Sequence, residues 1–558
     1  MPHQFEEIPI TTYTLPPTSS RSRAAGQKIA EKTAYLVASG DLRESANVAG
    51  WPVQAALETD LATAFGTLGW TIVRANDVDP LLGHAFIRSQ RMGMSVFQNI
   101  PADAPLIVAE AVWQYSHHVL AGLRSHRGPI LTVANFAPDW PGLVGLLGLN
   151  AGLTKMNVAY STIWSVDFTD DWFLNGIREW AETGTITHDA SHVFALPTLD
   201  RSDEKELGEA LADELLTQKA IIGVFDEGCM GMYNAIIDDE LLNPIGVYKE
   251  RLSQSALWAE MLTIDDDEAA EVGAWLVRRG MRFRVGTNEA TDLTAAQLCL
   301  QYKMYIAALR ISDDFGLDAV GIQYQQGLKD LSPASDLVEG LLNNVDRPPV
   351  RSRDGSRILW EGKALPHFNE ADEGVAVDAL VTNRVCLAMG IDPATTLHDV
   401  RWGEDFDGQF VWVYEISGSV PPAHLGGYQN AEGWRQDPVF FPAGGSTING
   451  VSQPGEIVWS RVYIADNVLN VDIGRASVVD LPASETERRK QLTNPEWPLA
   501  SVVLHGVNRD QFMARHKANH AQIFYAPDAE TADRALRVKA TMFDRLGIRV
   551  FLCGDVNP

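Results

Sequence analysis

Two near-continuous apolar stretches set the tightest limit on the fold of this chain. They span residues 106–113 and 129–136, and each contains at most one charged side chain. Strands with such uninterrupted apolar sequences are typical of parallel sheets, in which both faces are buried. The second stretch is followed by a short loop and by the apolar residues 143–153. This strand–loop–helix order predicts an open α/β sheet that binds its ligands at the carboxyl ends of its strands.

The remainder of the amino-terminal part fits the same pattern. We expect a helix at residues 61–68 and a strand at residues 70–74, and a helical pattern also covers residues 21–42. Residues 1–20 are polar and rich in Pro and Thr, with no basic segment followed by an apolar one. We therefore interpret them as an arm that packs on a neighbouring subunit and not as a secretory signal.

A second α/β unit is expected next. Ser202 followed by two acidic residues predicts the start of a helix that continues to Leu216. Buried strands are expected at residues 220–225 and 319–326, because both are apolar and end in polar residues. The acidic run at residues 265–268 is interpreted as the solvated start of a helix rather than as a metal site.

Beyond about residue 385 the sequence changes from helical to β-type. Short β-branched and aromatic runs at residues 410–414, 456–463 and 501–504 are separated by Gly/Pro-rich turns and are followed by a helix at about 529–546. We therefore predict an α/β protein in which two open α/β (Rossmann-like) domains precede a β-rich, barrel-like carboxyl-terminal domain. The length of 558 residues suits three domains, which we assign to residues 1–190, 191–385 and 386–558.

Composition restricts the classes of function. The chain has 45 Lys and Arg against 73 Asp and Glu, a net charge of −28 that is spread along the sequence. Such a surface repels nucleic acid and anionic membranes, and no apolar run is long enough to span a bilayer. The four cysteines form no CxxC pair, which favours reduced thiols in a cytoplasmic protein. The motifs of nucleotide-binding loops and of serine or zinc hydrolases are absent.

Three polar stretches supply the ligand types of a divalent metal site. They contain Glu370, Asp399 and His520. Two carboxylates and one imidazole with open positions suit a cation that prefers oxygen, so Mn²⁺ is the first expectation and Mg²⁺ the second. Asp372 and Glu373 lie close enough in sequence to replace Glu370 as the first ligand. Taken alone, a histidine before an apolar run is also typical of a core or capping residue.

This ligand set suits the movement of a carbonyl group between C1 and C2 of an open-chain sugar. The cation would bind two adjacent substrate oxygens, and Glu370 and Asp399 would transfer the proton across an enediol. Gln323 and Asn519 would bind substrate hydroxyls, and Trp113 would cover an apolar face of the sugar. Amides at the end of a strand, such as Gln323, are equally typical of an exposed surface.

The stretches that contain Glu370, Asp399 and His520 resemble, in their order along the chain, the L-fucose isomerase family. The resemblance is clearest from residue 321 to residue 558. Glu370 is similar to the first metal carboxylate and proton-transfer residue of that family, and Asp399 to the second carboxylate. His520, after Ala518 and Asn519, is similar to the metal histidine. Further similarity lies in Gly321-Ile322-Gln323-Tyr324-Gln325, Asp399-Val400-Arg401, Val479-Asp480-Leu481-Pro482, Pro495-Glu496-Trp497-Pro498 and Met230-Gly231-Met232.

The resemblance implies a manganese-dependent aldose–ketose isomerase of carbohydrate metabolism that acts on a small sugar such as L-fucose or D-arabinose. It also implies a homo-oligomer, a hexamer, in which Trp113 reaches the site of a neighbouring subunit. Arg21 or Arg23 would be the counterpart of the amino-terminal arginine of the family. Phe440 and Phe441 stand where a tyrosine that faces the substrate is expected, which favours a sugar whose far end carries no C6 hydroxyl.

Two other functions are compatible with the sequence. A metal-dependent aldolase or epimerase on a related polyol would use the same cation to stabilise an enediolate, and analysis of the products from one ketose would distinguish it. A non-catalytic sugar-binding protein would have two similar lobes and a secretory signal. The β-rich third domain and the polar amino terminus count against this last function.

Overall fold

The first domain is built on a five-stranded parallel sheet. The computed structural model describes residues 31–198, 200–228 and 231–556. The strand order of the sheet is β2-β1-β3-β4-β5, and every neighbouring pair is parallel. The order changes direction between β1 and β3, so the loops that follow these two strands diverge and leave an opening at the carboxyl edge. The strands are β1 (Thr33–Val37), β2 (Thr71–Arg74), β3 (Leu106–Glu110), β4 (Ile130–Asn135) and β5 (Ser161–Ser165).

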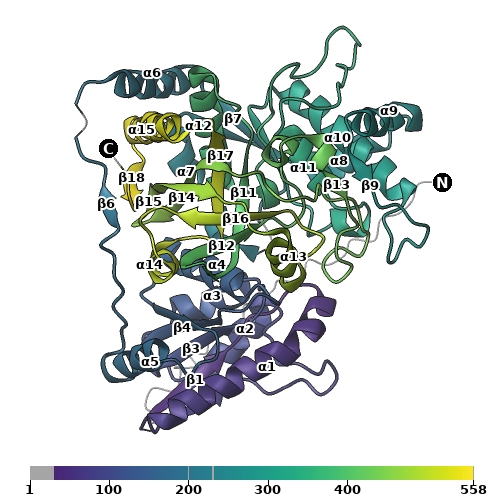
Figure 1. Ribbon diagram of the computed structural model, residues 1–558. Coiled ribbons are helices and arrows are strands. Elements are labelled where there is room, and N and C mark those ends of the chain that lie inside the picture. The colour runs from purple at the N-terminus through teal and green to yellow at the C-terminus, as the bar shows by residue number, and fades with distance from the viewer. Residues whose placement is uncertain (1–30, 199, 229–230, 557–558) are drawn as a thin grey trace, which may run out of the picture.

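One helix of this domain lies against the rest of the molecule. Helix α4 (Gly142–Lys155) is buried almost all round, because it packs on β4 on one side and on the carboxyl-terminal strands on the other. Figure 1 shows α4 between the amino-terminal domain and the upper part of the protein. The other helices of the domain are α1 (Glu44–Thr67), α2 (Gln90–Gln98), α3 (His117–Arg124) and α5 (Asp171–Thr183).

A second parallel sheet has the order β10-β7-β8. Its strands are β7 (Ala220–Phe225), β8 (Val247–Leu252) and β10 (Ala319–Ile322), and the long helix α10 (Ala295–Phe315) belongs to the same core. The other helices of this region are α6 (Asp203–Gln218), α8 (Gln254–Met261), α9 (Asp266–Arg278) and α11 (Asp336–Leu342).

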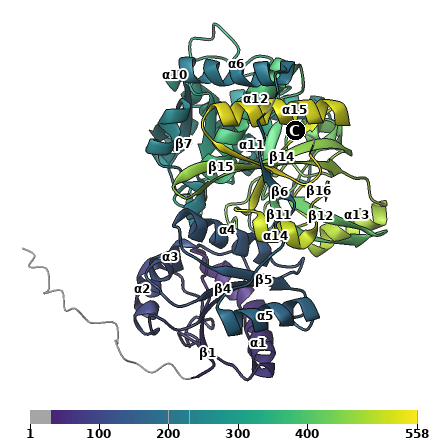
Figure 2. The same cartoon turned by 90° about the vertical axis from the view of Figure 1, so that its left-hand side faces the viewer.

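The carboxyl-terminal region contains a closed six-stranded antiparallel barrel. Its circuit runs β14-β17-β11-β12-β16-β15, and the pairing of β15 with β14 closes it. Strand β18 continues from β15, and β6, from the middle of the chain, pairs with β18. Figure 2 shows α12 and α15 over the barrel at the end remote from the first domain. These elements are β6 (Val193–Ala195), α12 (Glu373–Met389), β11 (Thr395–Phe406), β12 (Gln409–Glu415), β14 (Gly455–Ala465), β15 (Val468–Val478), α13 (Ala483–Leu492), β16 (Leu499–Leu504), α14 (Arg509–Arg515), β17 (His520–Ala526), α15 (Ala529–Arg545) and β18 (Arg549–Cys553).

Most of the expected elements are present. The mixed α/β architecture with parallel sheets and a carboxyl-terminal barrel is confirmed, as are the strands near residues 70–74, 106–113 and 129–136. The prediction of a helix over residues 21–42 is wrong for the part that the structure describes, because residues 33–37 form β1. This strand is hydrogen-bonded on both sides, to β2 and to β3, and these sheet contacts outweigh the local helical pattern.

The boundaries proposed between domains stay a prediction. The chain leaves the first sheet after α5, adds β6 to the edge of the carboxyl-terminal sheet, and then continues into α6, which lies beside α15. The predicted arm, residues 1–20, lies outside the described residues. Among the described helices none is long and apolar enough to cross a membrane.

Candidate active site

The three predicted ligand residues converge at one end of the barrel. Asp399 on β11 is directly opposite His520, the first residue of β17, in the antiparallel register. Such cross-strand neighbours have side chains on the same face of a sheet. The Nε2 atom of His520 lies 3.5 Å from Asp399 Oδ1 and 3.3 Å from Glu370 Oε2. Two carboxylates and one imidazole therefore face one another, although they come from separate parts of the chain.

The backbone conformation around Glu370 directs its side chain to the other two. Glu370 and Ala371 have φ values of 56° and 51°, in the left-handed region that residues with a Cβ rarely adopt. This short turn lies immediately before α12, so the side chain of Glu370 does not follow the direction of the helix. Ser417 donates a hydrogen bond of 2.8 Å to Glu370 Oε1, and Asn519 donates one of 3.2 Å to Asp399 Oδ1.

Asp372 fixes the orientation of the His520 ring. Its Oδ2 atom lies 2.8 Å from His520 Nδ1, and Arg461 donates two hydrogen bonds, of 2.6 and 3.2 Å, to the same carboxylate. All three side chains are buried. Burial alone would raise the pKa of Asp372, but the charge of Arg461 and the hydrogen bond with His520 hold it well below its usual range. An ionised Asp372 keeps the proton on Nδ1 and leaves Nε2 to face Glu370 and Asp399.

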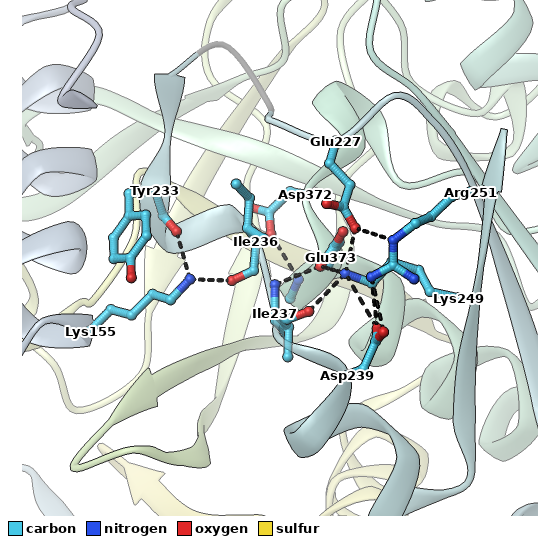
Figure 3. A network of polar contacts seen from close by, with 11 residues as sticks. Lys155, Glu227, Tyr233, Ile236, Ile237, Asp239, Lys249, Arg251, Asp372 and Glu373 are labelled. Carbon is cyan, nitrogen blue, oxygen red and sulfur yellow. Dashed lines mark hydrogen bonds and ion pairs between the residues drawn. The ribbon is translucent and has the colours of Figure 1, made fainter. Parts of the chain in front are cut away.

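The two acidic neighbours of Glu370 have other partners. Asp372 lies behind His520, and Glu373 accepts hydrogen bonds from the backbone N–H of Ile237 and from Lys249, whose Nζ atom is 2.9 Å away. Figure 3 shows Glu373 within this network, together with Glu227 and Arg251. Of the three acidic residues it is thus Glu370 that lies near His520 Nε2.

Charge is tightly balanced at this centre. Burial lowers the pKa of His520, but the hydrogen bond with Asp372 and the negative charges of the nearby Glu370 and Asp399 raise it to about 10. Burial raises the pKa of Asp399. Two acids and one imidazole in a buried place are stabilised by positive charge, which either a proton on the imidazole or a cation can provide.

The donor set fits a divalent metal ion. His520 Nε2 is buried and has no hydrogen-bond partner, while its other nitrogen is held by a carboxylate, as in most metal-binding histidines. Neighbouring ligands of an octahedral ion stand about 3 Å apart, slightly closer than the 3.3 and 3.5 Å found here. No group of three or more His, Cys, Asp or Glu in the described part of the chain is already arranged as a metal cluster. The three residues would therefore have to close in slightly around an ion.

A cavity opens above Glu370 and Asp399. Its walls are largely aromatic, from Trp113, Phe440, Phe441 and Trp497, and Asn519 adds an amide. Trp113 follows β3 and Arg43 follows β1, so both come from the opening between these strands. The aromatic wall and the polar floor together suit a ligand with an apolar face and several hydroxyls.

Trp113 differs from its prediction in one respect. The resemblance implied that it reaches the site of a neighbouring subunit, yet it lines the cavity of its own chain beside Glu370 and Asp399. The reason is the packing of α4 against the barrel, which brings the carboxyl edge of the first sheet over the site. Gly145 permits this approach, because a Cβ there would lie 2.6 Å from the carbonyl oxygen of Val112, next to Trp113.

Arg43 is a site residue that the sequence interpretation missed. Arg21 and Arg23, the predicted counterparts of the family arginine, lie outside the described residues. Arg43 lines the cavity, and Asp41 holds its guanidinium through bonds of 2.8 and 2.6 Å. It also donates hydrogen bonds of 3.0 Å to Gln325 Oε1 and 3.1 Å to the carbonyl oxygen of Phe440. An Asp-Leu-Arg sequence shortly after a buried strand was the signal available for it.

The other predicted substrate-binding residues are buried near the centre. Asn519 lines the main cavity, whereas Gln323 lines a second cavity beside it. Phe440 and Phe441, expected in place of a tyrosine, do border the main cavity.

No protein-family model matches the chain, and no curated protein matches it significantly.

Proposed function

We propose that this protein is a metal-dependent aldose–ketose isomerase similar to the L-fucose isomerase family. The observation that carries the proposal is that His520 Nε2 makes no hydrogen bond and faces Glu370 and Asp399, two carboxylates that line a cavity with aromatic walls. Glu370, Asp399 and His520 would hold Mn²⁺ or Mg²⁺. When bound, the cation would polarise two adjacent substrate oxygens and offset the negative charge that develops on them.

The chain's own residues account for the other requirements. Glu370 and Asp399 would take a proton from one carbon and return it to the next, a task for a carboxylate close to the reacting atoms. Ser417 and Asn519 hold one oxygen of each carboxylate and so limit the orientations from which the proton can move. Trp113 would shield the apolar face of the sugar from water, and Asn519 and Gln323 would bind its hydroxyls.

The proposal includes properties that follow from the resemblance and the composition. The two parallel sheets would belong to Rossmann-like domains, the protein would be a cytoplasmic homo-oligomer, and its partners would be small sugars rather than nucleic acid or membranes. L-Fucose and D-arabinose are the first candidates, because Phe440 and Phe441 offer no hydroxyl to a C6 hydroxyl group of the substrate.

Metal removal and replacement tests the proposal. Metal-stripped protein should regain activity with Mn²⁺, measured as ketose formed from a panel of L-fucose, D-arabinose and L-galactose. His520→Ala, Glu370→Gln and Asp399→Asn should each reduce both Mn²⁺ affinity and turnover by more than about 100-fold, since each removes one of three ligands. Asp480→Asn, at an exposed position, is the control and should match the wild type. Full activity in the metal-free protein, or cleavage or epimerisation products without ketose, would refute the proposal.

A further inference from the structure

Arg401 is a buried arginine in the wall of the main cavity. It is only 1 % exposed and lies two residues after Asp399 on β11. The pairing of β11 with β12 shifts between Val400 and Trp402, so Arg401 is the additional residue of a β-bulge. Bulges redirect side chains and are common beside active sites. Here the bulge brings a cation to the cavity that Asp399 also lines.

Most of the hydrogen-bonding capacity of this guanidinium group is unused. Nη1 donates a hydrogen bond of 3.0 Å to the carbonyl oxygen of Trp140, whereas Nε and Nη2 are buried and have no hydrogen-bond partner. Nε lies 3.4 Å from Glu415 Oε2, an ion pair without a hydrogen bond. Buried donors without an acceptor are uncommon and costly. Arg401 therefore has N–H groups left for an oxygen inside the cavity.

The other arginine of the cavity wall has no such capacity. Every nitrogen of the Arg43 guanidinium donates a hydrogen bond, and two of them bind the carboxylate of Asp41. In the same wall the Nε1 atom of Trp113 is a second buried donor without a partner. Among the described residues that line the cavity, Arg401 is thus the cation with N–H groups available to a ligand.

The charge of Arg401 favours one kind of ligand oxygen. Burial lowers the pKa of Arg401, and the charges of Glu415, Asp399 and Asp139 raise it; a guanidinium group stays protonated in proteins. A neutral hydroxyl group can accept its hydrogen bonds. An oxygen with a negative charge gains Coulomb attraction in addition, which is large in a buried place. The group therefore binds a negatively charged oxygen best.

An aldose–ketose isomerisation produces such an oxygen for a short time. Loss of the proton at C2 moves the C–H electron pair into the C1–C2 bond and the π electrons of the carbonyl group onto O1. The hydrogen of O2 then passes to O1, the carbonyl group forms at C2, and the proton returns at C1. No oxidant or reductant is consumed. A donor that binds the charged oxygen more strongly than the neutral one lowers the barrier.

We propose that Arg401 is a catalytic residue that donates hydrogen bonds to the substrate oxygen that becomes negatively charged during the reaction. This inference rests on the proposed isomerase function, in which Glu370 and Asp399 transfer the proton. Arg401 keeps its own proton throughout, so its effect is electrostatic. Its hydrogen bond to Trp140, in the loop before α4, holds the guanidinium group in place.

Calorimetric titration of the full chain with Mn²⁺ tests the inference. The two ligands are D-arabinitol, a neutral polyol, and D-arabinonohydroxamate, whose planar, ionisable head resembles the charged intermediate. Arg401→Gln should weaken binding of the hydroxamate by about tenfold or more and that of D-arabinitol by less than about threefold, with unchanged affinity for Mn²⁺. The attraction of the cation for the hydroxamate is common to both proteins, so the change in the ratio isolates Arg401. Arg475→Gln is the matched control, since Arg475 is a buried barrel arginine with an unpaired Nε that does not line the cavity.

Glu415→Gln provides a second, independent measurement. It removes the negative charge 3.4 Å from Arg401 but retains the guanidinium group. At pH 8, above the raised pKa of Glu415 of about 7, this variant should bind the hydroxamate at least about threefold more tightly than the wild type. If the ion pair only supported the fold, both variants would bind the hydroxamate more weakly. Arg401→Lys, which keeps the charge, should recover part of the kcat that Arg401→Gln loses.

Two results would overturn the inference: an unchanged ratio of the two affinities in Arg401→Gln, which would leave water as the partner of these N–H groups, or no gain in hydroxamate affinity in Glu415→Gln. Because Glu415→Gln retains Arg401, a folding defect of Arg401→Gln cannot hide a failure. The outcomes also separate this inference from the proposed function. Hydroxamate binding that depends on Arg401, without conversion of any aldose, would refute the isomerase and retain the anion-binding arginine. Ketose formation with hydroxamate binding independent of Arg401 would do the reverse.

Discussion

At the scale of single residues, Asp372 connects three functions that usually fall to separate side chains. It orients His520, it neutralises Arg461, and as the N-cap of α12 it accepts hydrogen bonds from the backbone N–H groups of Gly374 and Val375. Because one carboxylate does all three, the position of the histidine is tied to the start of a helix. A small movement of either is transmitted to the other.

Replacement of Asp372 by Asn should separate these functions. Asn caps helices about as well as Asp does, so α12 should remain, but a neutral amide no longer fixes the proton of His520. We expect the affinity for Mn²⁺, measured by titration of the metal-stripped protein, to fall about 10- to 100-fold. Asp528→Asn is the control, because Asp528 caps α15 through Thr531. Unchanged affinity in the Asp372 variant would show that the ring is held by other means.

The candidate site also shows which functional residues can be predicted from sequence alone and which cannot. Glu370, Asp399 and His520 could be selected because their residue types form a ligand set. The choice among Glu370, Asp372 and Glu373 could not be made, because it depends on two left-handed residues that no local pattern predicts. Arg43 was missed for a related reason. Besides Asp41, its contacts are with Gln325 and Phe440, which lie far away in sequence and meet it only after the chain has folded.

At the scale of elements, the start of α12 lies in close contact with β14. A Cβ on Gly374 would be 2.6 Å from the carbonyl oxygen of Val462 in that strand. Neither the strand nor the helix can move away freely, because Arg461, next to Val462, is bound to Asp372 at the cap. A glycine is therefore required where the helix begins.

Two glycine substitutions should have opposite effects on stability. Gly374→Ala should lower the free energy of unfolding by roughly 1–3 kcal/mol, because it overpacks this contact. Gly66→Ala should raise it by about 0.5–1 kcal/mol, since Gly66 lies in α1 with open space around it and Ala favours helix. Urea unfolding of both variants measures the difference. Equal stability of the two would mean that the α12–β14 contact is easily relaxed.

At the scale of the whole molecule, many ionisable groups are buried with opposite effects on acid stability. Burial lowers the pKa of His424 to about 4, so the fold keeps it neutral while the unfolded chain takes up a proton below about 6.5. Protonation of the unfolded chain therefore lowers the free energy of unfolding as the pH falls from about 6.5 to about 4. Burial raises the pKa of Glu415 to about 7 despite Arg401. Between about 7 and 4.5 its contribution increases as the pH falls, because the folded state binds the proton first.

Differences between variants and wild type isolate these contributions. Between pH 6.5 and 5.5, His424→Gln should gain about 1 kcal/mol in the free energy of unfolding relative to the wild type. Glu415→Gln should lose about 1 kcal/mol relative to the wild type over the same interval. Denaturant unfolding at the two pH values measures both. Parallel pH profiles for wild type and variants would contradict these assignments.

The pairing of β6 with β18 has a consequence for synthesis on the ribosome. Domains generally begin to fold in order as the chain emerges, and the first sheet is complete once β5 has left the exit tunnel. Strand β6 follows soon after, but its partner β18 is made only after all six barrel strands, and His520 is made only after five of them. The nascent chain must therefore carry an unpaired strand and an incomplete centre through most of translation. A chain released before β17 and β18 are made would have neither the β6–β18 pair nor His520 beside Asp399.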